Sequence, residues 1–345
     1  MRILQLAPLW ETVPPPAYGG IEAVVSLLTD GLVRAGHEVY LWASGDSKTL
    51  ARLNSVFPQS LRSAGVEDPS PYTWVHVAAA LEASRDCDII HNHVGELGMA
   101  LARLAPAPML TTIHNGVTPD CRFVWDSYVG HYNTVSWAAK RALPDKGFAG
   151  VIYNAIDVAS FRYTEEKGDY LLFLSRMSPE KGPQHAIETA RRLGKRLVMA
   201  GKVDPHWDGD FFEKVVRPQI DGELVEFVGE ADSETKRVLY SRACCLLVPI
   251  TWNEPFGLVM VEAMASGTPV IAFNAGAAPE IVISGETGYV VDDIDGMVEA
   301  VRRLDSIDPK RCRQHVERHF DLPRMVHDYL RMYERICTTQ SPSSA

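Results

Sequence analysis

The 345-residue sequence has no apolar run near the ~20 residues needed to span a bilayer. No signal-peptide pattern precedes its first apolar segment. Cysteine is sparse: the six cysteines are scattered, with neither the paired spacing of a zinc site nor the density of a disulfide scaffold. We therefore expect reduced thiols and a cytoplasmic location. Basic runs are also missing and the net charge is −10, which argues against nucleic acid as a partner.

The first loop lacks the glycine spacing of a dinucleotide-binding turn. It follows the apolar run MRILQLAP and closes with two adjacent glycines, Gly19 and Gly20, instead of G-x-G-x-x-G. An oxidoreductase is therefore disfavoured. Adjacent glycines still let the backbone approach a ligand closely, although a flexible turn before a helix is the plainer interpretation.

Short apolar runs alternate with amphipathic segments along the whole chain, which predicts an α/β fold with parallel sheets. The expected strands of the first half are MRILQLAP, HEVYLWAS, DIIHNH, PMLTTIHN, NTVSW and GVIYNAID, and those of the second half are YLLFLS, KRLVMAG, LVEFVGE, CCLLVPI, PVIAF and YVV. The polar segment VASFRYTEEKGD separates the two halves. The length also suits two domains, so we expect two doubly wound domains, residues 1–157 and 158–322.

The segment EPFGLVMVEAMASGTPVIA places two carboxylates around the start of a helix. Pro255 is tolerated at a first turn but not inside a helix, so we expect a loop carrying Glu254 and a helix from about Phe256 to Met264. The unpaired first amides of that helix suit a phosphate, held by the backbone of Phe256, Gly257, Leu258 and Val259. The carboxylate of Glu262 would repel phosphate but can accept two hydrogen bonds from a vicinal diol such as ribose. Taken singly, either glutamate would be interpreted as a solvated surface acid.

The segment SRMSPEKG follows the first strand of the second half. The strand end should deliver Arg176, Ser178 and Pro179 should start a helix, and Lys181 should lie in its first turn. Two cations there would stabilise the negative charge that builds on a departing nucleoside diphosphate. The alternative is a pair of ordinary surface cations.

These two segments resemble the signatures of the retaining nucleotide-sugar glycosyltransferases of family four. That family has two glutamates separated by seven residues, matched here by Glu254 and Glu262, and an Arg and Lys pair that grips the donor diphosphate, matched by Arg176 and Lys181. The resemblance covers nearly the whole chain. It implies the GT-B architecture, with two domains facing across a cleft and the last helix, from about 323 toward 345, crossing back onto the first domain.

The resemblance also implies roles for further residues. His114 matches the family residue beside the donor sugar, where it would stabilise positive charge on the anomeric carbon. The loop with Gly19 and Gly20 matches the one that touches donor phosphate and acceptor, while Val228, Gly229 and Glu230 would frame the base and Glu254 would orient the sugar hydroxyls. The family works without a metal ion or other cofactor. His91 and His93 alone resemble half a metal site, but no nearby motif supplies a third ligand, and a structural role is expected for them.

The implied activity is transfer of a sugar from a nucleoside-diphosphate sugar to a saccharide or other hydroxyl acceptor, in glycan or glycoconjugate biosynthesis. Two alternatives remain open: a sugar-nucleotide epimerase of the same fold, and a non-catalytic sugar-nucleotide binding protein. The sequence leaves the donor base, the acceptor and the oligomeric state undecided. Trp10, Tyr18, Trp125 and Tyr132 would either line a sugar subsite or pack locally. Contact with a membrane is not supported, because the basic residues of the first half are dispersed.

Overall fold

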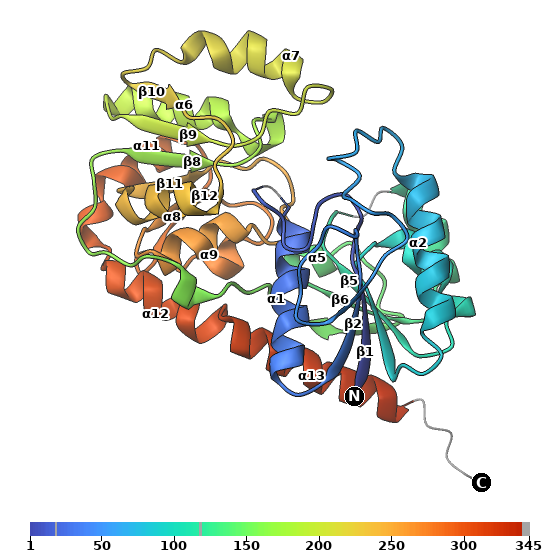
Figure 1. Ribbon diagram of the computed structural model, residues 1–345. Helices are drawn as coiled ribbons and strands as arrows, with labels where there is room; N and C mark the ends of the chain where they lie inside the picture. Colours follow the sequence, from blue (N-terminus) through green and yellow to red (C-terminus); the bar gives the residue numbers. More distant parts are fainter. Residues whose placement is uncertain (18, 117–118, 340–345) are drawn as a thin grey trace. The chain divides into compact units, whose positions relative to one another are not determined.

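The computed structural model describes residues 1–17, 19–116 and 119–339 (Figure 1). The chain divides into two compact units. Unit 1 comprises Met1–Asn154 and the chain from Leu322 onward, and unit 2 comprises Ala155–Asp321. These limits lie close to the expected ones at residues 157 and 323. In the described part of the chain, no helix is long and apolar enough to cross a membrane.

Unit 1 contains a parallel sheet of seven strands within the described residues, in the order β3-β2-β1-β4-β5-β6-β7. Strand β1 pairs with β2 on one side, Ile3 beside Val39, and with β4 on the other, Ile3 beside Ile89. The order therefore reverses between β1 and β4, which is where open parallel sheets bind ligands. The strands are β1 (Arg2–Leu6), β2 (Glu38–Trp42), β3 (Arg52–Asn54), β4 (Ile89–Asn92), β5 (Met109–Ile113), β6 (His131–Thr134) and β7 (Phe148–Val151).

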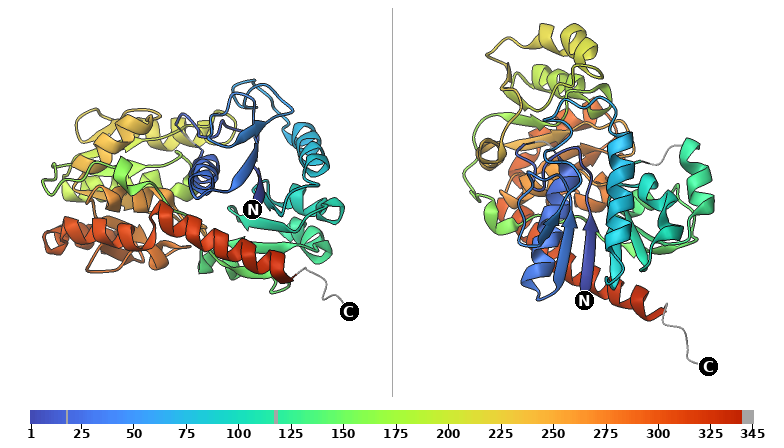
Figure 2. Two further views of the ribbon diagram at one scale, coloured as in Figure 1. Left: turned by 60° about the horizontal axis from the view of Figure 1, so that its bottom comes forward. Right: turned by 45° about the vertical axis from the view of Figure 1, so that its right-hand side comes forward.

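Different helices cover the two faces of this sheet. On one face Leu4 and Ile90 belong to an apolar cluster with Val77 and Trp125 from the helical segments. On the other face α13 reaches the sheet through Tyr333 and also contacts α1 (Figures 1 and 2). The helices are α1 (Gly20–Arg34), α2 (Ser70–Ala83), α3 (Glu96–Ala100), η1 (Ala102–Leu104), η2 (Pro119–Cys121), α4 (Arg122–Ser127), α5 (Trp137–Lys140) and α13 (Leu322–Thr339).

Unit 2 repeats the same plan with a parallel sheet of six strands in the part described, in the order β10-β9-β8-β11-β12-β13. Here the order reverses between β8 and β11, which pair through Leu171 beside Cys245 and Leu172 beside Leu246. The carboxyl ends of these two strands are thus adjacent. The strands are β8 (Leu171–Leu174), β9 (Leu197–Ala200), β10 (Val225–Phe227), β11 (Cys245–Val248), β12 (Val270–Phe273) and β13 (Gly288–Val291).

The helices of unit 2 connect these strands, with α6 packed against α11 and α9 packed against α8 and α12. They are η3 (Val158–Ser160), η4 (Pro179–Lys181), α6 (Pro183–Leu193), α7 (Gly209–Phe211), η5 (Phe212–Val216), η6 (Arg217–Gln219), α8 (Ser233–Arg242), α9 (Leu258–Ala265), α10 (Ala278–Ile281), α11 (Ile294–Arg302), η7 (Leu304–Ser306) and α12 (Pro309–His319). The α/β class with parallel sheets, expected from the alternation of apolar runs, is confirmed.

Several local expectations were wrong. Strand β3 was not anticipated, because RLN is short, polar and at the sheet edge. The helix expected from Phe256 begins at Leu258, since Phe256 is buried against Phe320 in the preceding loop. Ser178 and Pro179 begin only the short 3₁₀ turn η4, and the α-helix starts later, at Pro183.

The polar segment expected as a linker is held in place by Lys167. Its ammonium donates hydrogen bonds to Ser241 O at 3.2 Å, to Ser266 O at 2.8 Å and to Thr268 Oγ1 at 3.0 Å. Burial lowers the pKa of Lys167 to about 8. Three acceptors offset part of the cost of burying this charge, so the segment is anchored to unit 2.

A buried carboxyl group in the first turn of α1 makes stability depend on pH. Glu22 is only 5% exposed, and burial raises its pKa to about 7 against backbone hydrogen bonds that lower it. The folded chain keeps this proton up to about pH 7, whereas the unfolded chain loses it near the ordinary value of 4.5. Stability from this group is therefore lost as pH rises through this window.

We predict that Glu22→Gln stabilises the protein above pH 7 and has little effect near pH 5, because glutamine has the shape of the neutral acid. The gain at pH 8.5 should reach at most about 3 kcal/mol, at 1.36 kcal/mol per unit of pKa shift. Urea midpoints measured from pH 5 to pH 8.5 test this. Glu82→Gln, at an exposed position of α2, is the control. An equal effect of Glu22→Gln at both ends of the range would contradict the assignment.

Candidate active site

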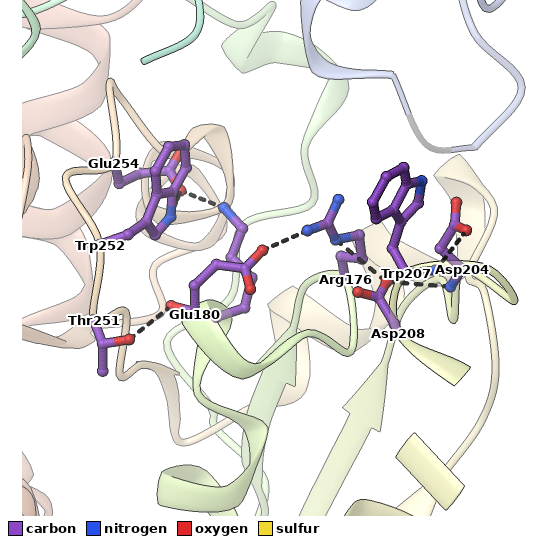
Figure 3. Close-up of polar contacts among 9 residues, drawn as sticks. Arg176, Glu180, Asp204, Trp207, Asp208, Thr251, Trp252 and Glu254 are labelled. Atoms are coloured by element: carbon purple, nitrogen blue, oxygen red, sulfur yellow. Dashed lines mark hydrogen bonds and ion pairs between the residues drawn. The ribbon is translucent and has the colours of Figure 1, made fainter. Parts of the chain in front are cut away.

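Three of the four signature residues of unit 2 follow the ends of β8 and β11; Arg176 and Glu254 are labelled in Figure 3. Arg176 and Lys181 follow β8, and Glu254 follows β11. Because the two strands are parallel neighbours, their carboxyl ends meet at one edge of the sheet. This edge is also where the strand order reverses, the usual ligand site of such sheets.

Arg176 is held by two carboxylates (Figure 3). Its Nη2 donates to Glu180 Oε1, and its Nε lies 3.3 Å from Asp208 Oδ2. Burial raises the pKa of Glu180, but its own backbone N–H, Ser178 and Arg176 outweigh that effect, and the net pKa lies below the ordinary value. Burial raises the pKa of Asp208, and Arg176 offsets this only in part. The guanidinium is thus fixed in direction by its partners and is about one-third exposed.

Lys181 turns to Glu254 instead. Its Nζ donates to Glu254 Oε2 and lies 4.9 Å from the centre of the Trp252 ring. Trp252 Nε1 donates to the same oxygen at 3.0 Å. With 18% of the lysine and 13% of the glutamate side chain exposed, this pair is far more shielded than a surface ion pair. Two donors occupy one oxygen of Glu254.

Two glycines allow the loops that carry this pair to approach each other. At Gly182, which has a φ of 76°, an added Cβ would lie 2.1 Å from Pro249 O, at the end of β11. At Gly276, with a φ of 54°, a Cβ would lie 2.3 Å from Glu254 O. A side chain at either position would force these backbones apart, so the closeness of Lys181 to Glu254 depends on both glycines.

The start of α9 lies directly after Glu254. Gly257 is its N-cap, and the first intrahelical bond at this end runs from Met260 N to Gly257 O at 3.0 Å. The amides of Leu258 and Val259 have no acceptor within the helix, as expected from the sequence. Further along α9, the buried Tyr240 hydroxyl donates to Glu262 Oε2 at 2.7 Å. This bond orients the Glu262 carboxylate and leaves its Oε1 for another donor.

The residues expected to frame a base follow β10. Val228 and Glu230 are exposed, and Gly229 O accepts a hydrogen bond from Gly201 N at 2.8 Å. This bond ties the loop after β10 to the loop after β9, which carries Trp207. Trp207 is 82% exposed and is drawn near Arg176 in Figure 3.

The expected site residues of unit 1 lie at the carboxyl ends of its own strands. Gly19 is the N-cap of α1, and His114 follows β5. His114 Nε2 lies 2.9 Å from His93 Nδ1, and burial lowers the pKa of His114 to about 4. Its imidazole is therefore neutral at pH 7. Within the described residues no group of three or more His, Cys, Asp or Glu side chains could hold a metal ion.

The aromatic residues considered for an acceptor subsite fall into three cases. Trp125 and Tyr132 are buried and pack edge to face with ring centres 4.9 Å apart, so they belong to the core. Trp10 is half-buried. Tyr18 lies outside the described residues.

Sequence reasoning missed several residues of the site. Glu180 is four residues beyond Arg176 and was visible as a possible partner. Asp208, Trp252 and Tyr240 gave no such indication, because they reach the site only through the fold.

Comparisons with known proteins identify the family of this chain. The family described as Glycosyl transferases group 1 matches residues 157–318, and Glycosyltransferase Family 4 matches residues 18–160. Glycogen synthase of Mycobacterium tuberculosis is 28% identical, with 88% of this chain and 86% of that protein covered.

Phosphatidyl-myo-inositol mannosyltransferase of Mycolicibacterium smegmatis is also 28% identical, with 87% and 84% of the two chains covered. The crystal structure of AviGT4, a glycosyltransferase involved in avilamycin A biosynthesis, has a TM-score of 0.76 and 28% identity and covers 98% of both chains. The two family matches together span residues 18–318, and both signature segments hold the expected side chains. The chain therefore belongs to glycosyltransferase family four, has the GT-B fold, and transfers a sugar from a nucleotide-sugar donor to a hydroxyl acceptor.

Proposed function

We propose that unit 2 binds the donor diphosphate at the ends of β8 and β11, between Arg176, Lys181 and the start of α9. The observation that carries this proposal is the shielded cluster in which Lys181 and Glu254 pair beside the first amides of that helix. Cations and helix amides both favour a phosphate. In this structure carboxylates hold both cations, so a phosphate has to replace or share these contacts.

The reaction uses this cluster when the donor bond breaks. The bond between the anomeric carbon and the β-phosphate oxygen breaks, and its electron pair stays on the phosphate. Arg176, Lys181 and the α9 amides stabilise this growing charge more than they stabilise the bound donor. The acceptor oxygen attacks the same face of the sugar, so the configuration is retained, and its proton passes to the departing phosphate.

Glu254 does not act as the nucleophile of this reaction. One of its oxygens already accepts hydrogen bonds from Lys181 and Trp252, which lowers its nucleophilicity, and its loop lies at the proposed diphosphate site. We assign it to the sugar hydroxyls. Glu262, oriented by Tyr240, binds the ribose diol through its remaining oxygen. The segment Val228–Glu230 frames the base.

Unit 1 contributes further groups to the proposed reaction. His114 stabilises positive charge on the anomeric carbon, and the loop with Gly19 and Gly20 serves donor phosphate and acceptor. The acceptor is a saccharide or another hydroxyl compound, and no nucleic acid takes part. We propose the cytoplasm as the compartment, because Cys87, Cys244, Cys245, Cys312 and Cys337 are free thiols, as is usual in a reducing compartment.

We predict that Lys181→Ala and Glu254→Gln each lower kcat by at least about 10²–10³-fold, the usual effect of losing one group that stabilises the transition state. The donor is first found by a thermal-shift screen of nucleotide sugars, since a ligand that binds the folded state raises its melting temperature. Release of nucleoside diphosphate is then followed with and without acceptors.

Matched controls are Lys214→Ala and Glu188→Gln, which remove exposed partners of surface ion pairs on unit 2. Both should keep full activity. Full activity in Lys181→Ala or Glu254→Gln would defeat the proposal. An isomerised donor sugar formed without acceptor would indicate an epimerase, and donor binding without any turnover would indicate a binding protein.

We predict that the Lys181–Glu254 pair is energetically coupled. A double-mutant cycle with Lys181→Met and Glu254→Gln should give about 0.5–3 kcal/mol of interaction energy, the range for residues in direct contact. The exposed pair Lys214–Asp210, with 71% and 91% of its side chains exposed, should give at most about 0.5 kcal/mol. Urea denaturation of the four variants in each cycle measures both values. Equal coupling in the two pairs would mean that the Lys181 pair is an ordinary surface contact.

We predict that transfer proceeds in excess EDTA at the rate measured without it, because Arg176 and Lys181 supply the positive charge that a divalent ion would otherwise provide. A loss of activity that Mg²⁺ or Mn²⁺ restores would show that the donor phosphates need a metal ion.

A further inference from the structure

A line of polar side chains is buried between the unit 1 sheet and α13. Gln5, His91, Thr112 and Asn133 come from four neighbouring strands, and none is more than 1% exposed. Their strand neighbours, such as Leu4 and Ile90, pack on the opposite face of the sheet. Buried polar groups are stable only when they are hydrogen-bonded, so the direction of each bond in this line can be worked out.

One branch of the line leads to His114. Gln5 Nε2 donates to Tyr333 Oη at 3.1 Å, and Gln5 Oε1 lies 2.8 Å from His93 Nε2. His93 Nδ1 in turn lies 2.9 Å from His114 Nε2. Gln5 and His93 are buried, whereas His114 is half-buried. His114 is therefore the most exposed member of a series of hydrogen bonds that begins in the core.

The amide of Gln5 fixes where the protons of this branch lie. Its oxygen can only accept, so His93 Nε2 must carry a proton. Burial, and then the neighbouring His91 and His114, hold the pKa of His93 well below its usual range, which leaves the ring neutral and Nδ1 without a proton. His93 Nδ1 can then only accept. The proton of the contact with His114 consequently belongs to His114 Nε2.

The hydrogen bonds of the other branch, from Tyr333 through His91 to Thr112, are consistent with this assignment of protons. Thr112 uses its proton on Asn133, so His91 Nε2 must donate to Thr112 Oγ1 at 2.6 Å. Burial holds the pKa of His91 well below its usual range, so the ring is neutral and its Nδ1 accepts from the Tyr333 hydroxyl at 2.7 Å. Thr112 donates to Asn133 Oδ1 at 2.7 Å.

Asn133 Nδ2 donates to Tyr329 Oη at 3.3 Å, and Tyr329 returns its proton to Thr112 at 3.1 Å. Each hydroxyl and ring proton is used once. Every contact of the network thus has one donor and one acceptor, which is consistent with the protons assigned to His93 and His114.

We propose that Gln5 and His93 are positioning residues that hold His114 as the neutral tautomer protonated on Nε2, with Nδ1 free to accept a hydrogen bond from a hydroxyl of the substrate. This inference rests on the proposed role of His114. A neutral ring with an unprotonated Nδ1 suits an alcohol and a developing positive charge, whereas an imidazolium would repel that charge.

The test begins with the wild-type protein. Histidine-selective ¹⁵N labelling and NMR at pH 7 read the tautomer of each ring, and difference spectra of His93→Gln and His114→Asn assign the two signals. The expected result is a proton on Nε2 in both rings. A proton on Nδ1 of His114 overturns the proposal, whatever the activity.

A second variant changes the tautomer without a change of shape. In Gln5→Glu the carboxylate stabilises a charged His93, whose Nδ1–H then donates to His114 and moves the His114 proton from Nε2 to Nδ1. We predict this switch in the ¹⁵N spectrum, with kcat lower by about 10–100-fold, the effect of losing a partner that orients a functional histidine. Tyr329→Phe is the control: it removes a buried hydroxyl from the other branch and should leave the His114 tautomer unchanged.

The tautomer of His114 and its role in the reaction are tested by different outcomes. Suppose that His114 is protonated on Nε2 and that Gln5→Glu switches the tautomer without loss of activity. Gln5 then does set the tautomer of His114, but the proposed role of His114 in the reaction is wrong. If Gln5→Glu folds, as judged by circular dichroism, and His114 keeps its Nε2 proton, Gln5 does not set the tautomer. If that variant does not fold, the wild-type spectrum alone decides the proposal.

Discussion

The parallel pairing of β8 with β11 is the constraint on which the site depends. It joins the end of one strand, which carries the two cations, to the end of another, which carries Glu254 and the start of α9. The connecting chain between them contains two further strands, so sequence proximity plays no part. Gly182 and Gly276 then remove the bulk that would keep the loops apart. The course of the backbone therefore brings the side chains of Lys181 and Glu254 together.

Much of the fold was predictable because the spacing of apolar residues within a short segment indicates whether that segment forms a strand or a helix. Apolar runs such as CCLLVPI and YLLFLS are buried strands, β11 and β8, and the segments between them are helices. The four signature residues, Arg176, Lys181, Glu254 and Glu262, were predicted from their resemblance to the family signatures, and the structure pairs two of them, Lys181 and Glu254. The helix start near Glu254 was predicted to within two residues, because proline and glycine mark such boundaries.

The rest depended on tertiary contacts that no local pattern contains. Asp208 and Tyr240 reach the site from loops and helices whose positions are set by packing. His91 and His93 were interpreted as structural residues, and both are buried and hydrogen-bonded: His91 joins Tyr333 of α13 to Thr112, and His93 joins Gln5 to His114. Strand β3 was missed because an edge strand needs few apolar residues. Local sequence patterns therefore predicted most helices and strands and the charged residues of the candidate site. They did not predict the hydrogen-bond partners that orient these charged side chains.

The tyrosines of α13 affect the order in which the two units can fold during synthesis. Gln5 and His91 leave the ribosome early, yet Tyr333, which completes their hydrogen bonds, is translated only after all of unit 2. Until then the nascent first unit carries polar groups that only water can satisfy, and its sheet face stays wet. Unit 1 therefore completes its packing last, although most of it is synthesised first.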